Sequence, residues 1–456
     1  MKGLTIGQIA EAVQGDLLAG RETAVVRNIC TDSRLAAEGD LFIPLIGERY
    51  DAHRFIPQAL EKGCNSLLVS GKSFAEAGPS ANIIAVKDTT AALQELAAYY
   101  LNLLSIKKIG VTGSTGKTST KDLLYHVCSG TYKCGKNAGN FNNLIGVPLT
   151  ILSLEEGTEV GIFEMGMDHP GEIDKLAEMI RPDMGIITNI GMAHIENLGS
   201  RENIFRAKME ITNYFRRSDT LIINQGGEFL TKENTAGDYR LVTVGTDGRS
   251  DYIISHIDDL GAQGIKFTLE YHGETEQFQL PVPGRHNAFN AALAVAAGAQ
   301  LGISMKDAAA GLAKAELTDN RLSVMGKNGI KVIDDTYNAS PDSMKSAIDV
   351  LMQTKGLRKV AILGDMLELG EFSRQQHELV GQYAAQQGVD VLIAIGPLAG
   401  FFLEGARGFP ENAVFYFKKK KDFLKDMTRI IGQGDVILVK GSRGMAMEEI
   451  VKKIME

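Results

Sequence analysis

The sequence predicts an α/β protein built from three domains, and three observations support this prediction. The chain has 456 residues, a length that suits about three domains. Short apolar stretches of strand length alternate with segments of helical periodicity. This alternation forms three blocks, so we expect domains at residues 1–87, 88–316 and 317–456.

The first block, residues 1–87, is expected to fold as a small α/β domain. Helical patterns cover residues 6–13 and 55–61. Strands are expected at residues 24–29, 41–45, 66–69 and 82–86. The block carries no obvious catalytic cluster.

The second block, residues 88–316, is expected to hold a doubly wound, mostly parallel sheet. It begins with a helix at residues 90–104. Strands separated by helical segments are expected at residues 160–164, 184–188 and 220–223. Residues 252–280 alternate apolar and polar side chains, which predicts an antiparallel ribbon, and an alanine-rich helix follows at 287–301. Ligands of such sheets bind at the carboxyl ends of the strands.

The third block, residues 317–456, is expected to be Rossmann-like. Each of its predicted strands is followed by a helical pattern, and these strands lie at residues 331–334, 359–363, 391–395, 413–417 and 435–439. The block lacks the Gly-x-Gly-x-x-Gly fingerprint of dinucleotide-binding domains. We therefore expect it to present a substrate and not a dinucleotide.

The composition excludes several classes of protein. Apolar residues make up 44% and charged residues 23% of the chain, as in ordinary globular proteins. A net charge of −8 argues against nucleic-acid binding, and residues 418–421, four lysines, are expected to form a solvated loop. There is no signal peptide and no apolar stretch of membrane-spanning length, so we expect a cytoplasmic protein without membrane contacts.

The cysteines point away from a disulfide framework and from a zinc site. Cys30, Cys64, Cys128 and Cys134 show no Cys-x-x-Cys spacing and lie in or beside apolar segments. We expect reduced thiols in or near the core.

Residues 106–121 carry the most informative motif. An apolar stretch runs into Gly113 and Gly116, and Lys117 and Thr118 open a helix expected at 119–128. Glycines let the backbone approach phosphate oxygens, amides at the helix start point at them, the lysine adds a cation, and the threonine hydroxyl can ligate Mg²⁺. A chance glycine-rich turn is the alternative, but the flanking strand and helix favour a phosphate-binding loop. The predicted phosphate contacts are Gly113, Ser114, Thr115, Gly116, Lys117, Thr118 and Ser119.

Two residues at strand ends are candidate metal ligands. Glu164 ends a buried strand, where a carboxylate can hold Mg²⁺ directly or through water, although an ordinary turn acid is the alternative. His194 follows the strand at 184–188. A lone histidine is usually structural, but its position at the same sheet edge favours a second metal contact.

Lys208 occupies an unusual position. In a helix expected at 202–216 it completes an apolar stripe with Ile204, Ile211 and Phe215. Its ammonium group could reach solvent along its stem. Alternatively, a desolvated lysine loses its proton readily, and the neutral amine can react with CO₂ to give a carbamate whose oxygens suit a hard metal. The sequence does not choose between these interpretations.

Three polar clusters complete the set of candidate site residues. Asn287 and Asn290 lie near a helix start, where they could bind an adenine edge or simply cap the helix. Residues 334–341 follow a strand and are dense in polar side chains, although turns also collect such residues. Residues 440–444 end the last strand and offer two cations with glycines to an anionic substrate.

At these residues the chain resembles the Mur ligases of peptidoglycan synthesis, and the resemblance covers all three blocks. The shared motifs are Thr-Gly-x-x-Gly-Lys-Thr at 112–118, Glu-Met-Gly at 164–166, Asn-Ile-Gly-x-x-His at 189–194, Arg-Ala-Lys-x-Glu at 206–210, Gly-Arg-His-Asn-x-x-Asn at 284–290 and Asp-Asp-Thr-Tyr-Asn-Ala at 334–339. Residues 39–51, 337–341 and 362–370 resemble the branch of the family that adds D-alanyl-D-alanine.

The resemblance implies an ATP-dependent ligase. ATP would phosphorylate the terminal carboxylate of UDP-N-acetylmuramoyl-tripeptide to an acyl phosphate. The amine of D-alanyl-D-alanine would then attack, and the tetrahedral intermediate would collapse to an amide, with ADP and phosphate as the other products. We expect a monomer whose domains close as rigid bodies on binding.

The resemblance also assigns roles to particular residues. Thr118 and Glu164 would hold a first Mg²⁺, and His194 and carbamylated Lys208 a second, with Lys117 as a further catalytic residue. The nucleotide would also contact Asn287, Asn290, Arg321 and Asp335. The muramoyl-peptide and acceptor substrates would contact Ser33, Arg34, Gly47, Asp51, His53, Asn140, Asn338, Asp365, Lys440 and Arg443.

Other functions are considered beside this one. A sibling amide ligase, either another Mur ligase or a folylpolyglutamate synthase, would share the loop and the acyl-phosphate chemistry and differ in its acceptor. A regulatory GTPase would need an Asn-Lys-x-Asp motif, which the sequence lacks. A non-catalytic paralogue is disfavoured because Lys117, Glu164, His194 and Lys208 are all present.

Overall fold

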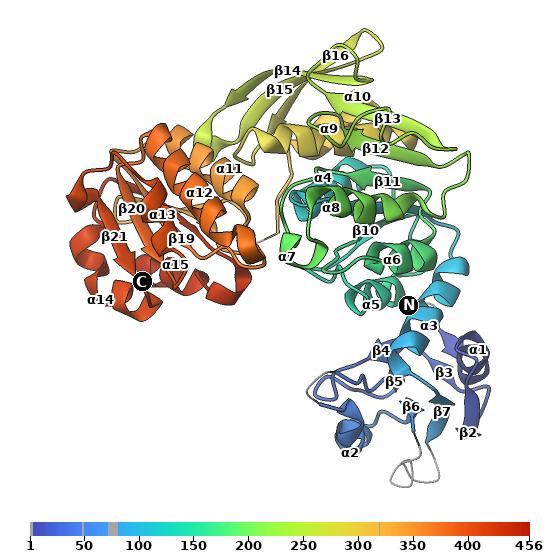
Figure 1. The fold of residues 1–456 in the computed structure, drawn as a ribbon. Coiled ribbons are helices and arrows are strands. Elements are labelled where there is room, and N and C mark those ends of the chain that lie inside the picture. The colour runs from blue at the N-terminus through green and yellow to red at the C-terminus, as the bar shows by residue number, and fades with distance from the viewer. Residues whose placement is uncertain (1–2, 48–49, 72–80, 319) are drawn as a thin grey trace. The chain divides into compact units, whose positions relative to one another are not determined.

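The computed structural model describes residues 3–47, 50–71, 81–318 and 320–456, and its elements are labelled in Figure 1. Two compact units emerge from the contacts between residues. The first unit comprises residues 1–110, 132–166 and 172–183, and the second comprises residues 111–131, 167–171 and 184–456.

The first unit contains a small five-stranded sheet near the N-terminus. Its strands, in spatial order, are β2 (Asp16–Ala19), β7 (Asn82–Val86), β6 (Ser66–Ser70), β5 (Asp40–Phe42) and β4 (Asn28–Cys30). All neighbours pair in parallel except β2, which runs antiparallel at the edge. Helix α2 (Ile56–Glu61) contributes to the apolar core of this sheet. The predicted small α/β fold is therefore confirmed.

The remainder of the first unit is built around a long helix. Helix α3 (Thr89–Asn102) begins at Asp88, whose side chain caps its first turn. It packs against α5 (Gly146–Ser153) and α6 (Glu172–Ile180). Strand β10 (Val160–Glu164) is buried along its whole length and pairs in parallel with β9 (Cys134–Lys136).

The central part of the second unit contains a mostly parallel sheet. Strands β11 (Met184–Ile187), β12 (Thr220–Asn224), β13 (Arg240–Gly245) and β14 (Tyr252–Asp259) pair in parallel in this order. Strands β15 (Ile265–Tyr271) and β16 (Glu274–Leu280) continue it as an antiparallel ribbon. Helix α9 (His286–Gln300) packs on β12 to β15, and α4 (Lys117–Cys128) packs on α9. The predicted sheet and ribbon are confirmed.

The C-terminal part of the second unit is a six-stranded sheet with helices on both faces. Its strands, in spatial order, are β17 (Ser323–Lys327), β18 (Ile330–Asp335), β22 (Asp435–Lys440), β19 (Arg358–Gly364), β20 (Val391–Ile395) and β21 (Val414–Phe417). Only the edge strand β17 is antiparallel to its neighbour.

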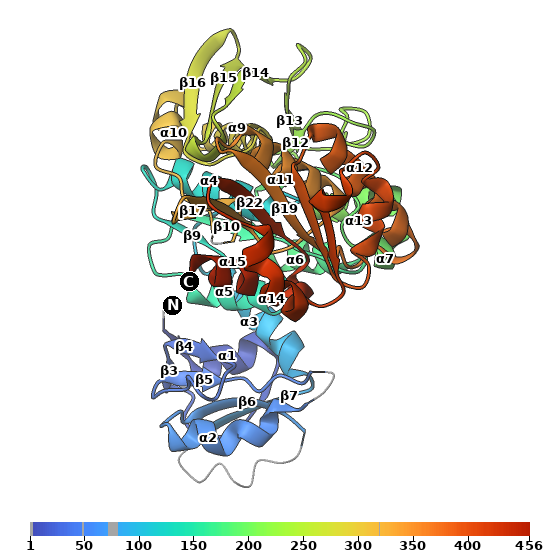
Figure 2. The same ribbon diagram turned by 90° about the vertical axis from the view of Figure 1, so that its left-hand side faces the viewer.

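The helices of this part lie on opposite faces of its sheet. Helices α14 (Lys420–Ile430) and α15 (Glu448–Met455) pack their apolar side chains on one face. Helices α11 (Pro341–Gln353), α12 (Ser373–Gln387) and α13 (Gly400–Gly405) lie on the other side in Figures 1 and 2. The Rossmann-like prediction is confirmed.

Several local predictions were wrong. The helix expected at 202–216 is α8 (Arg201–Met209) followed by a short 3-10 turn, because the Thr212 hydroxyl donates back to the Met209 carbonyl and competes with helix continuation. The strand expected at 24–29 breaks at Arg27 into β3 (Val25–Val26) and β4. Strands β1 (Leu4–Thr5), β2, β9, β13 and β17 were not predicted.

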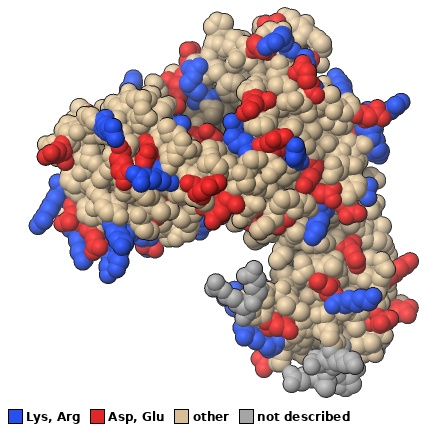
Figure 3. Space-filling view, in the orientation of Figure 1, with Lys and Arg blue, Asp and Glu red and all other residues tan. Residues whose placement is uncertain are grey.

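Only the first two of the four consecutive lysines, Lys418 and Lys419, lie in the solvated loop that we expected. Helix α14 starts at Lys420, whose ammonium group donates to the carbonyls of Met445 and Ala446 and pairs with Glu449 at 2.9 Å. Figure 3 shows acidic and basic side chains interspersed over the visible face.

The predicted location of the cysteines in or near the core is confirmed. Cys30, Cys64 and Cys128 are buried, Cys134 is partly buried, and all four are free thiols. Within the described ranges, we find no helix whose length and apolar content would let it cross a membrane.

Candidate active site

The glycine-rich segment folds as a loop between strand β8 (Lys107–Thr112) and helix α4. Gly113 has φ of 147° and Gly116, which caps α4, has φ of 78°. A Cβ atom at Gly113 would lie 1.8 Å from the Thr188 hydroxyl oxygen, and one at Gly116 would lie 2.7 Å from Asn290 Oδ1. Both positions therefore require glycine, for conformation and for space.

Residues 188–191, which follow β11, hold the loop in shape. The Thr115 amide donates to Asn189 Oδ1 at 2.9 Å, and Asn189 Nδ2 donates to the Thr115 hydroxyl at 2.5 Å. The Ser114 amide donates to the Asn189 carbonyl at 3.1 Å, and the Gly191 amide donates to Ser114 Oγ at 2.9 Å. Sequence reasoning missed this supporting role of Asn189, although the residue lies in a motif that it had singled out.

Lys117 and Thr118 lie where the loop becomes a helix. The Lys117 ammonium group donates to the Gly113 carbonyl at 2.8 Å and to the Ser114 carbonyl at 3.4 Å, so it lies over the loop. Thr118 is buried in the first turn of α4. A helix start with a lysine over a glycine loop provides positive potential and amide donors for phosphate oxygens.

His194 lies between two carboxylates. Its Nδ1 atom is 2.8 Å from Glu368 Oε2 and 3.1 Å from Asp168 Oδ1. Burial lowers the pKa of His194, but the two carboxylates outweigh this effect and the pKa is raised. The contact with His194 lowers the pKa of Asp168.

The same three side chains could bind a divalent metal ion. One ligand atom from each of Asp168, His194 and Glu368 lies within 4.8 Å of the others. An imidazole nitrogen with carboxylate oxygens is a common donor set for such ions. We had predicted His194 but not its two partners, although Glu368 lies within the singled-out segment 362–370.

Lys208 is buried on α8, with 1% of its surface exposed. Burial, together with the positive charge of Lys117, holds the pKa of this amine well below its usual range. An ammonium group that extends to solvent is therefore excluded. Burial thus works against the charged ammonium form, in the direction that a carbamate requires.

In the first unit, Glu164 ends β10 as predicted, and its side chain is buried. Its Oε1 atom accepts a hydrogen bond from Asn142 Nδ2 at 2.8 Å, and its amide donates to Asn137 Oδ1 at 2.6 Å. A Cβ atom at Gly166 would lie 2.8 Å from the Asn142 amide carbon, so the glycine makes room for this partner. Asn140 is exposed in the same loop.

The two asparagines at the start of α9 form a buried pair. Asn290 Nδ2 donates to Asn287 Oδ1 at 2.9 Å, and Asn287 Nδ2 donates to the Pro283 carbonyl at 2.8 Å. Because Asn290 lies beside Gly116, the pair is next to the phosphate loop. Burial lowers the pKa of the adjacent His286 to about 4, so this imidazole is neutral near pH 7.

Several predicted residues of the third block meet at the carboxyl edge of its sheet. Asp335 and Lys440 end adjacent strands, and their charged atoms are 2.5 Å apart. Lys440 also donates to the Asn338 carbonyl at 2.8 Å. The Arg321 guanidinium group lies 4.2 Å from the Tyr337 ring centroid. Its buried Nε atom has no hydrogen-bond partner among the described residues, which leaves a donor for a ligand.

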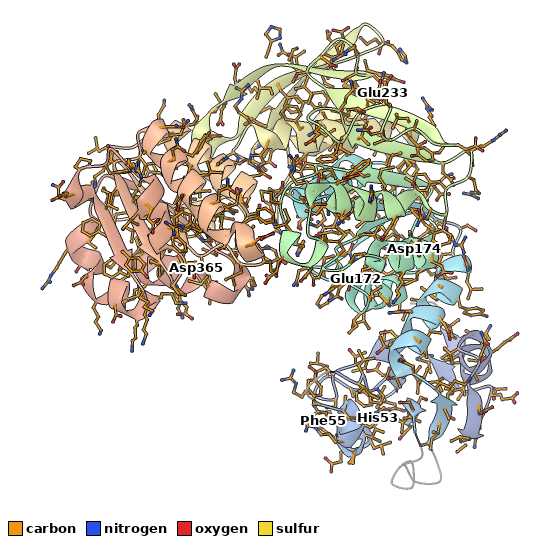
Figure 4. The ribbon with its side chains drawn as sticks, viewed as in Figure 1. His53, Phe55, Glu172, Asp174, Glu233 and Asp365 are labelled. Atoms are coloured by element: carbon orange, nitrogen blue, oxygen red, sulfur yellow. The ribbon has the colours of Figure 1, made fainter. Side chains whose placement is uncertain are left out.

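Asp365 and Arg443 are placed differently from these residues. Asp365, labelled in Figure 4, is buried, and its Oδ1 atom accepts from the Leu398 amide at 3.1 Å. Burial raises the pKa of its carboxyl group. The side chain thus supports the strand end and offers little surface to a substrate. Arg443 is exposed and pairs with Glu448 at 3.2 Å.

The predicted substrate residues near the N-terminus lie in the first unit. The Ser33 hydroxyl donates to Gln58 at 2.6 Å, and Arg34 pairs with Asp32 at 2.6 Å. That pairing holds the pKa of Asp32 at about 2.

A second group of predicted substrate residues in this unit surrounds His53, labelled in Figure 4. Asp51 Oδ1 accepts from the His53 amide at 2.9 Å, and His53 Nε2 accepts from the Ser70 amide at 3.0 Å. The Gly47 amide donates to the Tyr50 carbonyl at 3.0 Å. Glu48 and Arg49, part of the same predicted loop, lie outside the described residues.

Comparisons with known proteins agree on one family. A model described as the Mur ligase middle domain matches residues 111–298, and one described as the Mur ligase glutamate ligase domain matches residues 320–443. The chain is 41% identical over 456 residues to the UDP-N-acetylmuramoyl-tripeptide–D-alanyl-D-alanine ligase of Bacillus subtilis, with 99% of this chain and 98% of the relative covered.

Two solved structures extend the likeness to the fold. A crystal structure of MurF from Acinetobacter baumannii has a TM-score of 0.92 at 33% identity and covers 100% of this chain and 99% of that chain. The MurF ligase of Thermotoga maritima, solved in complex with ADP, has a TM-score of 0.82 at 28% identity and covers 94% and 97%.

Proposed function

The chain belongs to the Mur ligase family, and on this basis we propose that it joins D-alanyl-D-alanine to UDP-N-acetylmuramoyl-tripeptide at the expense of ATP. This reaction builds the peptide of a peptidoglycan precursor. The observation that carries the proposal is a full-length identity of 41% to a ligase of that name, in a chain whose phosphate loop is intact.

The reaction proceeds in two steps. A terminal carboxylate oxygen of the tripeptide attacks the γ-phosphorus, and the bond to the β,γ-bridging oxygen breaks. ADP is released, and the carboxylate has become an acyl phosphate. The unprotonated amine of D-alanyl-D-alanine then attacks the acyl carbon, and the tetrahedral intermediate expels phosphate and loses a proton to give the amide. The protein contributes mainly positioning and charge stabilisation to such transfers.

The phosphate loop carries the first step. Amides of residues 113–118 and the Lys117 ammonium group bind the β- and γ-phosphates, and the lysine leaves its carbonyl partners to do so. Asn287 and Asn290 contact the nucleotide beside the loop, and Arg321 and Asp335 contact it from the third block.

The residues present fit divalent cations. Thr118, Glu164, Asp168 and Glu368 offer oxygen donors, and His194 offers a nitrogen. Bound Mg²⁺ would neutralise charge on the phosphate groups as it develops. We propose that Lys208, whose burial favours the neutral amine, carries a carbamate that adds oxygen donors.

The setting of the reaction follows from its substrates. UDP-linked precursors and ATP are nucleotides of the cytoplasm, so we propose that the chain works there, as a monomer. We further propose domains at 1–87, 88–316 and 317–456, and the two matched domain models fall inside the second and third.

Phosphate release tests the proposed acceptor pair. With ATP and Mg²⁺, the purified chain is expected to release phosphate only when UDP-N-acetylmuramoyl-tripeptide and D-alanyl-D-alanine are both present. A folate with glutamate serves as the control pair, because folylpolyglutamate synthases share the chemistry. Release with the folate pair and none with the muramoyl pair would overturn the proposal.

A further inference from the structure

An open pocket of about 620 Å³ is lined mainly by the central part of the second unit. Its walls come from the segment that follows β11 and from the turn that follows β12, the parallel neighbour of β11. Helices α7 (Ile195–Leu198) and α8, labelled in Figure 1, also contribute. Sheets of this kind bind ligands at the carboxyl ends of their strands, and the volume suits a small molecule or a long side chain.

Four apolar side chains of the central part line this pocket, namely Met192, Ile195, Phe205 and Phe229. The rings of Phe205 and Phe229 stack with their centroids 5.7 Å apart. Asn234 Nδ2 donates to the Phe229 carbonyl at 3.2 Å and so holds the turn that carries this ring. Surfaces of this kind cover the aliphatic stem of a long side chain while its charged end stays in water.

A cation and an anion lie side by side in the lining. Arg201 Nη1 is 3.5 Å from Glu228 Oε2, and Arg201 Cζ is 5.0 Å from the Phe229 ring centroid. The two charged side chains are 43% and 71% exposed, so the ion pair is weak and each partner can bind a ligand group instead. Glu202, which also lines the pocket, pairs with Arg206 at 2.6 Å. The best complement is a ligand with both a carboxylate and an ammonium group.

The pocket adjoins the candidate active site. Residues 192–195 contribute to its lining and include the candidate metal ligand at position 194. Arg201 Nη2 donates to the Ile190 carbonyl at 3.1 Å. The amide of the next residue, Gly191, donates to Ser114 Oγ in the phosphate loop at 2.9 Å. The pocket is therefore within reach of the side chain of a residue that is bound at this loop.

In the proposed function, the terminal carboxylate of the tripeptide receives the γ-phosphoryl group at the phosphate loop. The side chain of that third residue begins two bonds from the reacting carbon, so it needs space beside the loop. We propose that the pocket receives this side chain, and that Arg201 and Glu228 select one that ends in both a carboxylate and an ammonium group, as in 2,6-diaminopimelate. This inference rests on the proposed function.

Two other occupants complement the pocket less well. The side chains of D-alanyl-D-alanine are methyl groups, which would fill little of a space of about 620 Å³. A lysine side chain has a four-carbon stem for the apolar walls, but it ends in an ammonium group alone and offers nothing to Arg201. Arg201 is therefore a specificity-determining residue, whereas the aromatic walls serve either side chain.

The test measures kcat/KM for two forms of UDP-N-acetylmuramoyl-tripeptide, one ending in diaminopimelate and one in lysine, with saturating ATP and D-alanyl-D-alanine. The parent is expected to prefer the diaminopimelate form by about ten-fold, because a partly exposed hydrogen bond between charged groups contributes about that much. In Arg201→Leu this ratio should fall to near one. Both forms are measured on one preparation, so partial unfolding or a disturbed phosphate loop lowers both values and leaves the ratio unchanged.

Two further variants separate the charged pair from the apolar walls. Arg217→Leu is the matched control, because this arginine is also exposed on the central part but pairs with Asp238, away from the pocket lining. Its ratio should equal that of the parent. Phe205→Ala removes a wall that both side chains contact, so KM should rise several-fold, by the same factor for the two tripeptides.

A parent ratio of one or below, or a ratio that Arg201→Leu leaves unchanged, would overturn the assignment. A rise in KM for D-alanyl-D-alanine alone in Arg201→Leu would also overturn it, since the pocket would then hold the acceptor. If the parent turns over neither tripeptide, the proposed function is at fault. Turnover of both forms without discrimination contradicts only the assignment of the pocket.

Discussion

Lys208 shows how burial can change the chemistry of a single side chain. Its amine is enclosed by the protein, which lowers its pKa, and the positive charge of Lys117 lowers this pKa further. Both influences oppose protonation. A charged lysine at this position would destabilise the fold. The proposed function suggests that the neutral amine instead reacts to form a carbamate.

Replacement of Lys208 tests whether a carbamate at this position takes part in the reaction. Lys208→Ala is expected to abolish phosphate release in the complete assay, and added bicarbonate or short-chain carboxylic acids should restore part of it, since they can supply oxygen donors in the vacated space. Lys208→Arg is the control, because it fills the space and cannot form a carbamate. A normal rate in the alanine variant would remove the carbamate from the mechanism.

The ion pairs of His194 contribute to the stability of the folded state, and this contribution depends on pH. The raised pKa of His194 means that the folded state binds its proton more tightly than the unfolded chain does. The stabilisation is fully present below the unfolded pKa of about 6.5 and is lost as pH rises through the folded pKa.

Glu368→Gln should therefore destabilise the protein more at pH 5.5 than at pH 9. The difference in unfolding free energy should be about 1 kcal/mol or less, since Glu368 is about half exposed and solvent screens the pair. Urea unfolding of parent and variant at both pH values measures it. An equal effect at the two values would show that His194 and Glu368 do not form a charged pair.

At the scale of elements, the phosphate loop depends on the residues after β11 as much as on its own glycines. Asn189 satisfies the Thr115 amide and hydroxyl, and its carbonyl accepts from Ser114. The loop is thereby held in one conformation before a ligand arrives. Such preorganisation reduces the entropy that binding would otherwise cost.

Asn189→Ala is expected to weaken ATP binding by about ten-fold, because one or two hydrogen bonds that shape the loop are lost, each worth about 1 kcal/mol. Titration calorimetry with ATP and Mg²⁺ measures the change. Asn412→Ala, at an exposed position on the C-terminal part, is the matched control and should bind like the parent. Unchanged affinity in the Asn189 variant would show that the glycines alone shape the loop.

The success of sequence reasoning at this scale depended on the kind of signal. Apolar runs such as residues 160–164 and 391–395 predicted buried strands correctly, because a central parallel strand is apolar on both faces. Strand β17 was missed because it is a partly exposed edge strand with Gly326 and Lys327 at its end. The partners of His194 were missed because Asp168 and Glu368 are far apart in the chain, and only the tertiary fold brings them together.

At the scale of the whole molecule, the residues to which we assign functions are divided among separate parts of the chain. The phosphate loop and Lys208 belong to the central region, whereas Arg321, Asp335 and Lys440 belong to the third block. Motif order along the chain predicted this division.

The central claim is that the loop from Gly113 to Thr118 binds the triphosphate of ATP together with a divalent cation. Titration calorimetry of the parent and of Lys117→Ala with ATP and saturating Mg²⁺ tests it most directly. We predict a clear heat of binding for the parent that is lost in the variant, because the ammonium charge over the loop is gone. Absence of ATP binding by the parent, or equal binding by both proteins, would contradict the claim.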